Sequence, residues 1–205
     1  MEVESTALGR EVARKLDILR PVLEPVSWTV YEARFPPGIT LDQGAILTAY
    51  REQMGYLIES GWAAADVGVD LESLTLPSAM VELYGITDGA DATGIELWTS
   101  DGWWSKGEIM NGDGHAHRLE EHWLKFGLWG NDCFLVSLTS GEVMFSDQYF
   151  WRYNENDSSR VLAPDMLTFV DEYMLGPKCL EFVGDDNDDP SWHAWYSLLQ
   201  QSGFA

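Results

Sequence analysis

The chain has 205 residues, 45% of them apolar, which is enough to bury a core and argues against disorder. With 34 acidic and 12 basic residues its net charge is -22, which excludes nucleic acids and anionic membrane surfaces as partners, because both are bound through cations. The acidity instead predicts a basic protein partner, whose approach the charge would accelerate. The alternative is an acidic surface that serves solubility alone.

The cysteines and the apolar segments bear on the cellular compartment. Cys133 and Cys179 are the only cysteines, too few for a disulfide framework or a structural zinc site. There is no run of about 18 apolar residues that could span a membrane. The first ten residues, MEVESTALGR, lack the apolar segment of a secretory signal. We therefore expect a compact cytoplasmic protein with reduced thiols and no cofactor.

The charge is unevenly spread along the chain. From Glu52 to Ser105 there is no Lys or Arg, while acidic residues recur throughout. After Lys178 no cation follows, and the tail carries the acidic segment GDDNDDP over 184–190. Such regions attract basic partners, although many charge runs are simply solvated.

Three elements are predicted in the first third of the chain. Apolar residues at helical spacing predict a helix over 5–21, which Pro21 is expected to end. Alternating residues predict a strand over 26–35. Thr40 and Gln43 form a capping-box pattern that begins a second helix, extending to about residue 61.

The middle of the chain alternates between regular and loop-like segments. A helix is predicted over 76–91, ending in a polar glycine turn, and a strand over 94–99. Residues 105–118 have the composition of a loop. Residues 119–127 fit either a short helix or the approach to the next strand.

The last third predicts a hairpin and two helices. Alternation over 134–138 and 143–145 predicts two strands joined at Ser140-Gly141, and the aromatic segment 148–153 predicts a further strand. Apolar spacing predicts helices over 162–176 and 191–201. The pattern is that of an α+β fold, an antiparallel sheet flanked by helices.

Two metal sites can be considered. Asp113, His115 and His117 lie together in NGDGHAHR and are chemically able to bind zinc, but the glycines around them favour a surface loop. The acidic segment GDDNDDP resembles the start of a calcium loop. It has Pro190 where an EF-hand requires glycine and Tyr196 where it requires glutamate, so the EF-hand interpretation fails.

A cysteine nucleophile is the other catalytic possibility. Cys133 would need a base, and His122 is the nearest histidine in sequence, but no catalytic signature surrounds the cysteine. Serine-hydrolase, phosphate-loop and dinucleotide-binding motifs are also missing from the sequence. We expect a protein that is not an enzyme.

The order of motifs between residues 76 and 176 carries a family resemblance. Leu76-Pro77 precedes a helix, then come LYGITDGAD, GIELW, HWLKFG, GLWGNDCFLVSLTSGEVMFSD and LAPDMLTFVDEYML. This order resembles the SMI1/KNR4 family, also called the SUKH superfamily. Members of that family have an LP-helix ending in a polar glycine turn, a strand opened by glycine and Asp or Asn, a G-x-V return strand and a closing helix.

Each family motif has a counterpart in this sequence. The turn corresponds to Thr87-Asp88-Gly89, the strand to Gly130–Leu138, the return strand to Gly141-Glu142-Val143, and the closing helix begins near Ala163. Many members have Asp at the fifth strand position, where this chain has Ser137, and this leaves the subgroup open. Gly130-Asn131-Asp132 would then be a turn that starts a central strand, with Cys133 packed in or beside the core.

The resemblance implies a division of the chain and a function. Residues 76–176 would form the SMI1/KNR4-like core, 1–75 an added helical extension packed on it, and 177–205 an acidic loop with a last helix. Bacterial members are mostly immunity proteins that neutralise toxins delivered by contact-dependent or type VI secretion systems. Eukaryotic relatives are regulatory scaffolds, which leaves an endogenous partner as the alternative function. A metal-dependent hydrolase around Asp113, His115 and His117 is a third hypothesis.

The immunity hypothesis predicts acidic and aromatic residues that would occlude the active site of a cognate, basic toxin domain. The candidate toxin-binding residues are Asp88, Asp91, Trp103, Trp104, Asp185, Asp186, Asp188, Asp189 and Trp192. Core packing is the alternative role for Trp103 and Trp104, of which at most one is expected to be buried if they lie on a strand. A solvated linker is the alternative for the Asp-rich loop. Self-association is left open by the sequence.

Overall fold

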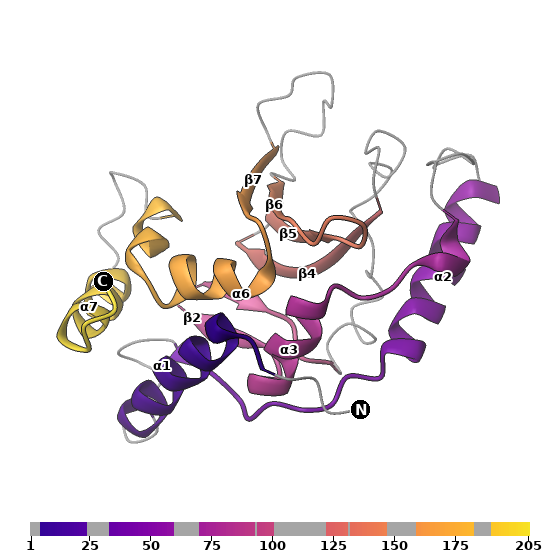
Figure 1. The fold of residues 1–205 in the computed structure, drawn as a ribbon. Helices are drawn as coiled ribbons and strands as arrows, with labels where there is room; N and C mark the ends of the chain where they lie inside the picture. Colours follow the sequence, from indigo (N-terminus) through magenta and orange to yellow (C-terminus); the bar gives the residue numbers. More distant parts are fainter. Residues whose placement is uncertain are drawn as a thin grey trace.

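A computed structural model describes residues 5–23, 33–59, 70–92, 94–100, 122–130, 132–146, 159–182 and 190–205. Within these residues the chain forms one antiparallel sheet of seven strands in sequence order, β1 to β7, together with helices (Figure 1). The predicted α+β class with an antiparallel sheet is therefore confirmed. The edges of the described sheet are β1 and β7.

The strands are short at the beginning of the sheet and longer in its centre. They are β1 (Ala33–Arg34), β2 (Ala90–Ala92), β3 (Ile95–Leu97), β4 (Trp123–Trp129), β5 (Asp132–Ser137), β6 (Val143–Ser146) and β7 (Ser159–Ala163). The ambiguous segment 119–127 thus contributes to a strand. Strands β2 and β7 were not predicted, because the sequence pattern assigned their overlapping residues to the polar glycine turn after the helix over 76–91 and to the start of the helix over 162–176.

In sequence order within the described residues, one helix precedes β1, three lie between β1 and β2, and the others follow β7. They are α1 (Ala7–Leu23), α2 (Gln43–Glu59), the 3₁₀ helix η1 (Leu71–Ser73), α3 (Ser78–Ile86), α6 (Met166–Phe169), the π-helix η3 (Val170–Met174), the 3₁₀ helix η4 (Pro177–Phe182) and α7 (Pro190–Gln201). Figure 1 places α2 and α7 at opposite ends of the molecule, with α1, α3 and α6 between them.

Several predicted boundaries differ from the structure. Pro21 lies inside α1, in its last turn, and does not end it. Asp42 rather than Thr40 caps α2, since its carboxylate accepts the backbone N–H of Ala45 at 3.0 Å. Of the strand predicted over 26–35, the described part is β1. The strand predicted over 148–153 lies outside the described residues.

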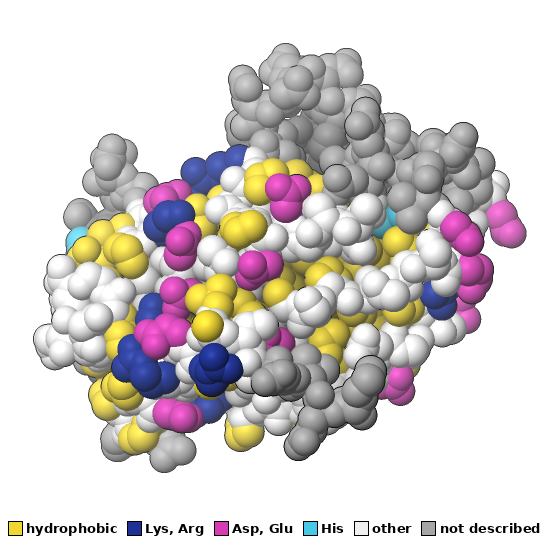
Figure 2. Space-filling model, in the orientation of Figure 1, with side chains coloured by type: hydrophobic (Ala, Val, Ile, Leu, Met, Phe, Trp, Pro, Cys, Tyr) yellow, Lys and Arg dark blue, Asp and Glu magenta, His cyan; other side chains and the backbone are white. Residues whose placement is uncertain are grey.

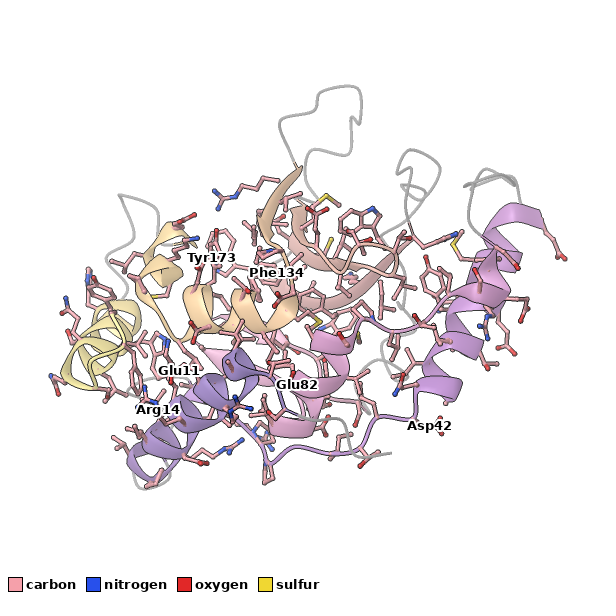
Figure 3. The ribbon with its side chains drawn as sticks, viewed as in Figure 1. Glu11, Arg14, Asp42, Glu82, Phe134 and Tyr173 are labelled. Atoms are coloured by element: carbon pink, nitrogen blue, oxygen red, sulfur yellow. The ribbon has the colours of Figure 1, made fainter. Side chains whose placement is uncertain are left out.

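The core lies between one face of the sheet and the helices. Phe169 of α6 contacts Phe134 of β5, with ring centroids 4.9 Å apart, and Phe126 of β4 at 6.0 Å (Figure 3). The same cluster of buried residues extends from Val12 of α1 to Phe204 near the C-terminal end of the described chain. It takes side chains from each of the three segments, 1–75, 76–176 and 177–205.

The β4–β5–β6 region follows the turn chemistry of its sequence. Gly130, between β4 and β5, has φ of 60°, and Gly141, before β6, has φ of 85°, a conformation that favours glycine. The hydroxyl of Ser137 accepts the backbone N–H groups of Thr139 and Ser140 at 3.1 and 2.9 Å. Ser137 therefore stabilises the β5–β6 turn.

Candidate partner-binding surface

The turn that contains Asp88 is held together by its own side chains. The hydroxyl oxygen of Thr87 lies 2.9 Å from the carbonyl oxygen of Pro36 and 2.7 Å from that of Gly89, so its single O–H can donate to either of them. The carboxylate of Asp88 accepts the backbone N–H of Ser100 at 2.8 Å and its hydroxyl at 3.2 Å. Asp88 thus ties the end of α3 to the chain after β3, and both of its carboxylate oxygens already have partners.

Asp91 lies on the sheet face opposite to the one that packs against α6. Strand register places a single row of residues across the sheet on this face: Arg34, Asp91, Glu96, Leu128, Cys133, Ser146 and Ser159. The charged members of the row all come from β1 to β3. Asp91 therefore has Arg34 on one side and Glu96 on the other, and both carboxylates are partly exposed.

The other predicted contact side chains lie outside the part of the chain that the structure describes. Trp103, Trp104, Asp185, Asp186, Asp188 and Asp189 lie outside the described residues. Trp192 belongs to α7, but its side chain is also outside the described part. Of the nine candidates, the structure places Asp88 and Asp91, and these two sit on different features of the fold.

The structure does not form the pairing of Cys133 with His122 that a cysteine nucleophile would need. Cys133 pairs with Leu128 in the β4–β5 register, whereas His122 precedes Trp123, which pairs with Ser137. Five residues of strand separate Trp123 from Leu128, or roughly 17 Å. His122 is buried and its Nδ1 lies 3.3 Å from the hydroxyl of Tyr50 in α2, where burial raises the pKa of that phenol. The structure thus places His122 in the packing between α2 and the start of β4.

The residues of the metal-site hypothesis are not among those that the structure describes. Asp113, His115 and His117 all lie outside them. In the described parts of the chain, no group of three or more His, Cys, Asp or Glu residues is arranged to bind a metal ion. Among the helices formed by those parts, none has the length and apolar content required to cross a membrane.

Exposed carboxylates gather at the end of the molecule formed by α2 and η1. We call this surface the acidic end, and its members are Asp42, Glu52, Glu59, Asp70 and Glu72, all of them exposed. Figure 2 shows acidic side chains along this edge, and Figure 3 places Asp42 where α2 begins. Glu52 and Glu59 are seven residues apart on the helix and so share its outward face, about 10 Å from each other.

Two of these five carboxylates cap the start of a helix. Asp42 caps α2 through Ala45, and Asp70 caps η1 by accepting the backbone N–H of Glu72 at 3.1 Å. Glu52, Glu59 and Glu72 remain as the carboxylates best placed to meet a partner. The side chain of Glu72 is 81% exposed.

Helix α1, which lies at a distance from the acidic end, carries four cations (Figure 1). Arg10, Arg14, Lys15 and Arg20 all belong to this helix. At the acidic end, by contrast, Arg51 is the only cation that the sequence supplies between Arg34 and Lys106. Around α1, however, acidic side chains lie among the cations, with ion pairs Glu11–Arg14, Asp171–Lys15 and Asp17–Arg20, so the acidic end differs chiefly in having few cations.

The acidic end was missed when individual contact residues were chosen from the sequence. Its signal was present, because the stretch from Glu52 to Ser105 has no cation. Sequence alone did not show that η1 returns to α2 after about twenty residues. Without that contact, Glu52 and Glu72 belong to separate segments and do not form one surface.

Comparison with known proteins does not assign the chain to a family. No protein-family model matches it. A search of curated proteins likewise found no match.

Proposed function

We propose that this chain is an immunity protein, which binds a cognate toxin domain and neutralises it by covering its active site. The toxin is expected to be basic and to be delivered by a contact-dependent or type VI secretion system. The motif order between residues 76 and 176 supports the immunity role. The acidic end is the observation that carries the binding hypothesis.

The exposed carboxylates of the acidic end, which have few cations near them in the sequence, supply the physical argument. An exposed group of carboxylates on one end of a chain with net charge -22 attracts a basic surface and orients it during encounter. The association rate should therefore fall as salt screens the charges, over the range in which the Debye length shortens from about 30 to 8 Å. Affinity beyond the encounter requires apolar or aromatic contacts at the centre of the interface.

The first test uses, as the candidate toxin, the C-terminal domain of the protein encoded by the neighbouring gene. The two proteins are co-expressed and growth is measured, and the association rate of the purified pair is determined at several salt concentrations. We expect rescue of growth and an association rate that falls with salt. Binding without rescue would favour the regulatory scaffold, and no binding to the neighbouring product would contradict the immunity role.

A charge-matched pair of variants tests the surface. Glu52→Gln, Glu59→Gln and Glu72→Gln together remove three charges from the acidic end. Asp17→Asn, Glu142→Gln and Glu181→Gln remove the same number elsewhere. We expect the first variant to slow association about tenfold or more and the second to have a much smaller effect, since local charge guides docking. Equal effects would show that net charge, and not the acidic end, determines the encounter.

A further inference from the structure

Arg51 connects the two parts of the acidic end. It lies on the flank of α2, and its Nε donates to the carbonyl oxygen of Leu71 in η1 at 2.9 Å. One terminal nitrogen, Nη2, donates to the carbonyl oxygen of Glu72 at 3.3 Å. The Glu72 carboxylate lies 3.9 Å from Nε, within ion-pair distance but too far for a hydrogen bond. These two hydrogen bonds of the guanidinium therefore go to the backbone of η1.

This geometry suits arginine in particular. The two carbonyl groups belong to consecutive residues, and the planar fork of a guanidinium can address both at once, whereas a lysine ammonium is a single point charge. The arginine is about one quarter exposed, at 26%, so its hydrogen bonds are partly shielded from water. Leu71, whose carbonyl it holds, also packs against the core.

We propose that Arg51 is a positioning residue, which holds η1 against α2 so that Glu52, Glu59 and Glu72 meet a partner as one surface. This inference rests on the proposed function for its biological meaning. Its partner chemistry follows from the spacing of Glu52 and Glu59: the partner must present basic side chains over a span of at least about 10 Å. In this proposal Arg51 acts through η1 rather than through a contact with the partner.

The inference makes an unusual prediction about charge. Arg51→Gln removes a positive charge from the acidic end, so a purely electrostatic role for Arg51 predicts tighter binding of a basic partner. A positioning role predicts weaker binding, because Glu72 is no longer held in register with α2. We expect Arg51→Gln to weaken affinity about tenfold through a faster dissociation rate. Arg51→Lys, which keeps the charge and loses the fork, should also weaken it.

Amide hydrogen exchange, measured on the free protein, tests whether Arg51 positions η1 and needs no partner. In the native η1 turn, the amide of Glu72 bonds to the Asp70 carboxylate, and the amide of Ser73 bonds to the Asp70 carbonyl at 2.9 Å. We expect faster exchange of these amides in Arg51→Gln and Arg51→Lys, with β5 amides unchanged as evidence that the variants fold. Arg160→Gln, which removes a partly exposed cation paired with Glu181, is the matched control and should leave exchange at η1 unaltered.

Failure of the positioning inference can be distinguished from failure of the proposed immunity function. Unchanged exchange at η1 in both Arg51 variants, or tighter binding by Arg51→Gln, would overturn the positioning inference. If exchange increases as expected but the wild-type protein does not bind the toxin domain, the positioning holds and the proposed function fails.

Discussion

At the scale of single residues, Glu82 of α3 shows how one carboxylate can position a helix from outside it. Its Oε1 accepts the hydroxyl of Ser5 and the backbone N–H of Thr6, both at 2.7 Å, where α1 begins (Figure 3). A negative group here satisfies an otherwise unpaired donor and complements the positive end of the helix dipole. A Cβ at Gly9 would lie only 1.9 Å from the same oxygen.

This contact predicts a reversal of sign in a double-mutant cycle. Gly9→Ala should destabilise the wild-type protein, because the methyl group displaces the Glu82 carboxylate. In a Glu82→Ala background the obstruction is gone, so Gly9→Ala should stabilise by about 0.5–1 kcal/mol through helix propensity. Urea denaturation of the four proteins measures the free energies of unfolding. Equal effects of Gly9→Ala in both backgrounds would contradict this account.

Cys179 gives a prediction about alkaline pH. Burial raises the pKa of its thiol from 9.0 to about 11. Between these values the unfolded thiol ionises while the folded thiol keeps its proton, so the unfolded state binds fewer protons and the free energy of unfolding falls as pH rises. Below pH 9 both states are protonated, and this group has no effect.

The measurement is denaturation between pH 8 and 11 for the wild type and Cys179→Ala. We expect a shallower decline in the variant, although tyrosines with raised pKa, such as Tyr84, contribute a decline of their own at the upper end. Parallel curves for the two proteins would show that the Cys179 thiol is not the source.

At the scale of elements, the π-helix η3 is coupled to α1 through a buried lysine. The Nζ of Lys15 lies 2.7 Å from the Asp171 carboxylate and within 3.3 and 3.4 Å of the carbonyl oxygens of Asp171 and Leu175. The amide of Leu175 bonds to the carbonyl of Val170, the i to i+5 pattern of a π turn. Lys15 thus provides donors to carbonyl groups of the last turn of η3.

Lys15→Met should therefore destabilise by about 2–3 kcal/mol, since it leaves a partly buried carboxylate without its cation. The estimate is below the range for fully buried pairs because the side chain of Asp171 is 21% exposed. Adding Asp171→Asn should recover part of the loss, because the unpaired charge is then removed. Chemical denaturation of the two single variants and the double variant measures this. Additive losses would indicate that the two side chains act independently.

At the scale of the whole molecule, the charge of -22 opposes the compact state through self-repulsion. Screening should therefore stabilise the free protein while it slows association with a basic partner. We expect the melting temperature to rise as sodium chloride increases from about 10 mM to 0.5 M. The triple variant of Glu52, Glu59 and Glu72 should show a smaller rise, and a melting temperature that falls with salt would contradict the repulsion argument.

The sequence by itself determined the features that arise from neighbouring residues. Period-two alternation predicted β5 and β6, glycine placement predicted the turns at Gly130 and Gly141, and helical spacing predicted α1, α2 and α7. Composition established the acidity. These features depend on a few consecutive side chains, so they can be read locally.

Only the tertiary structure decided which distant residues share a surface. Strand β2 exists because β1 and β3 pair with it on either side, and its three residues predict nothing alone. Asp88 became a structural residue once Ser100 was placed beside it. The acidic end combines α2 with η1, some twenty residues further along the chain, and Arg51 of α2 donates hydrogen bonds to the backbone of η1. Such contacts depend on packing between elements, which local sequence patterns do not encode.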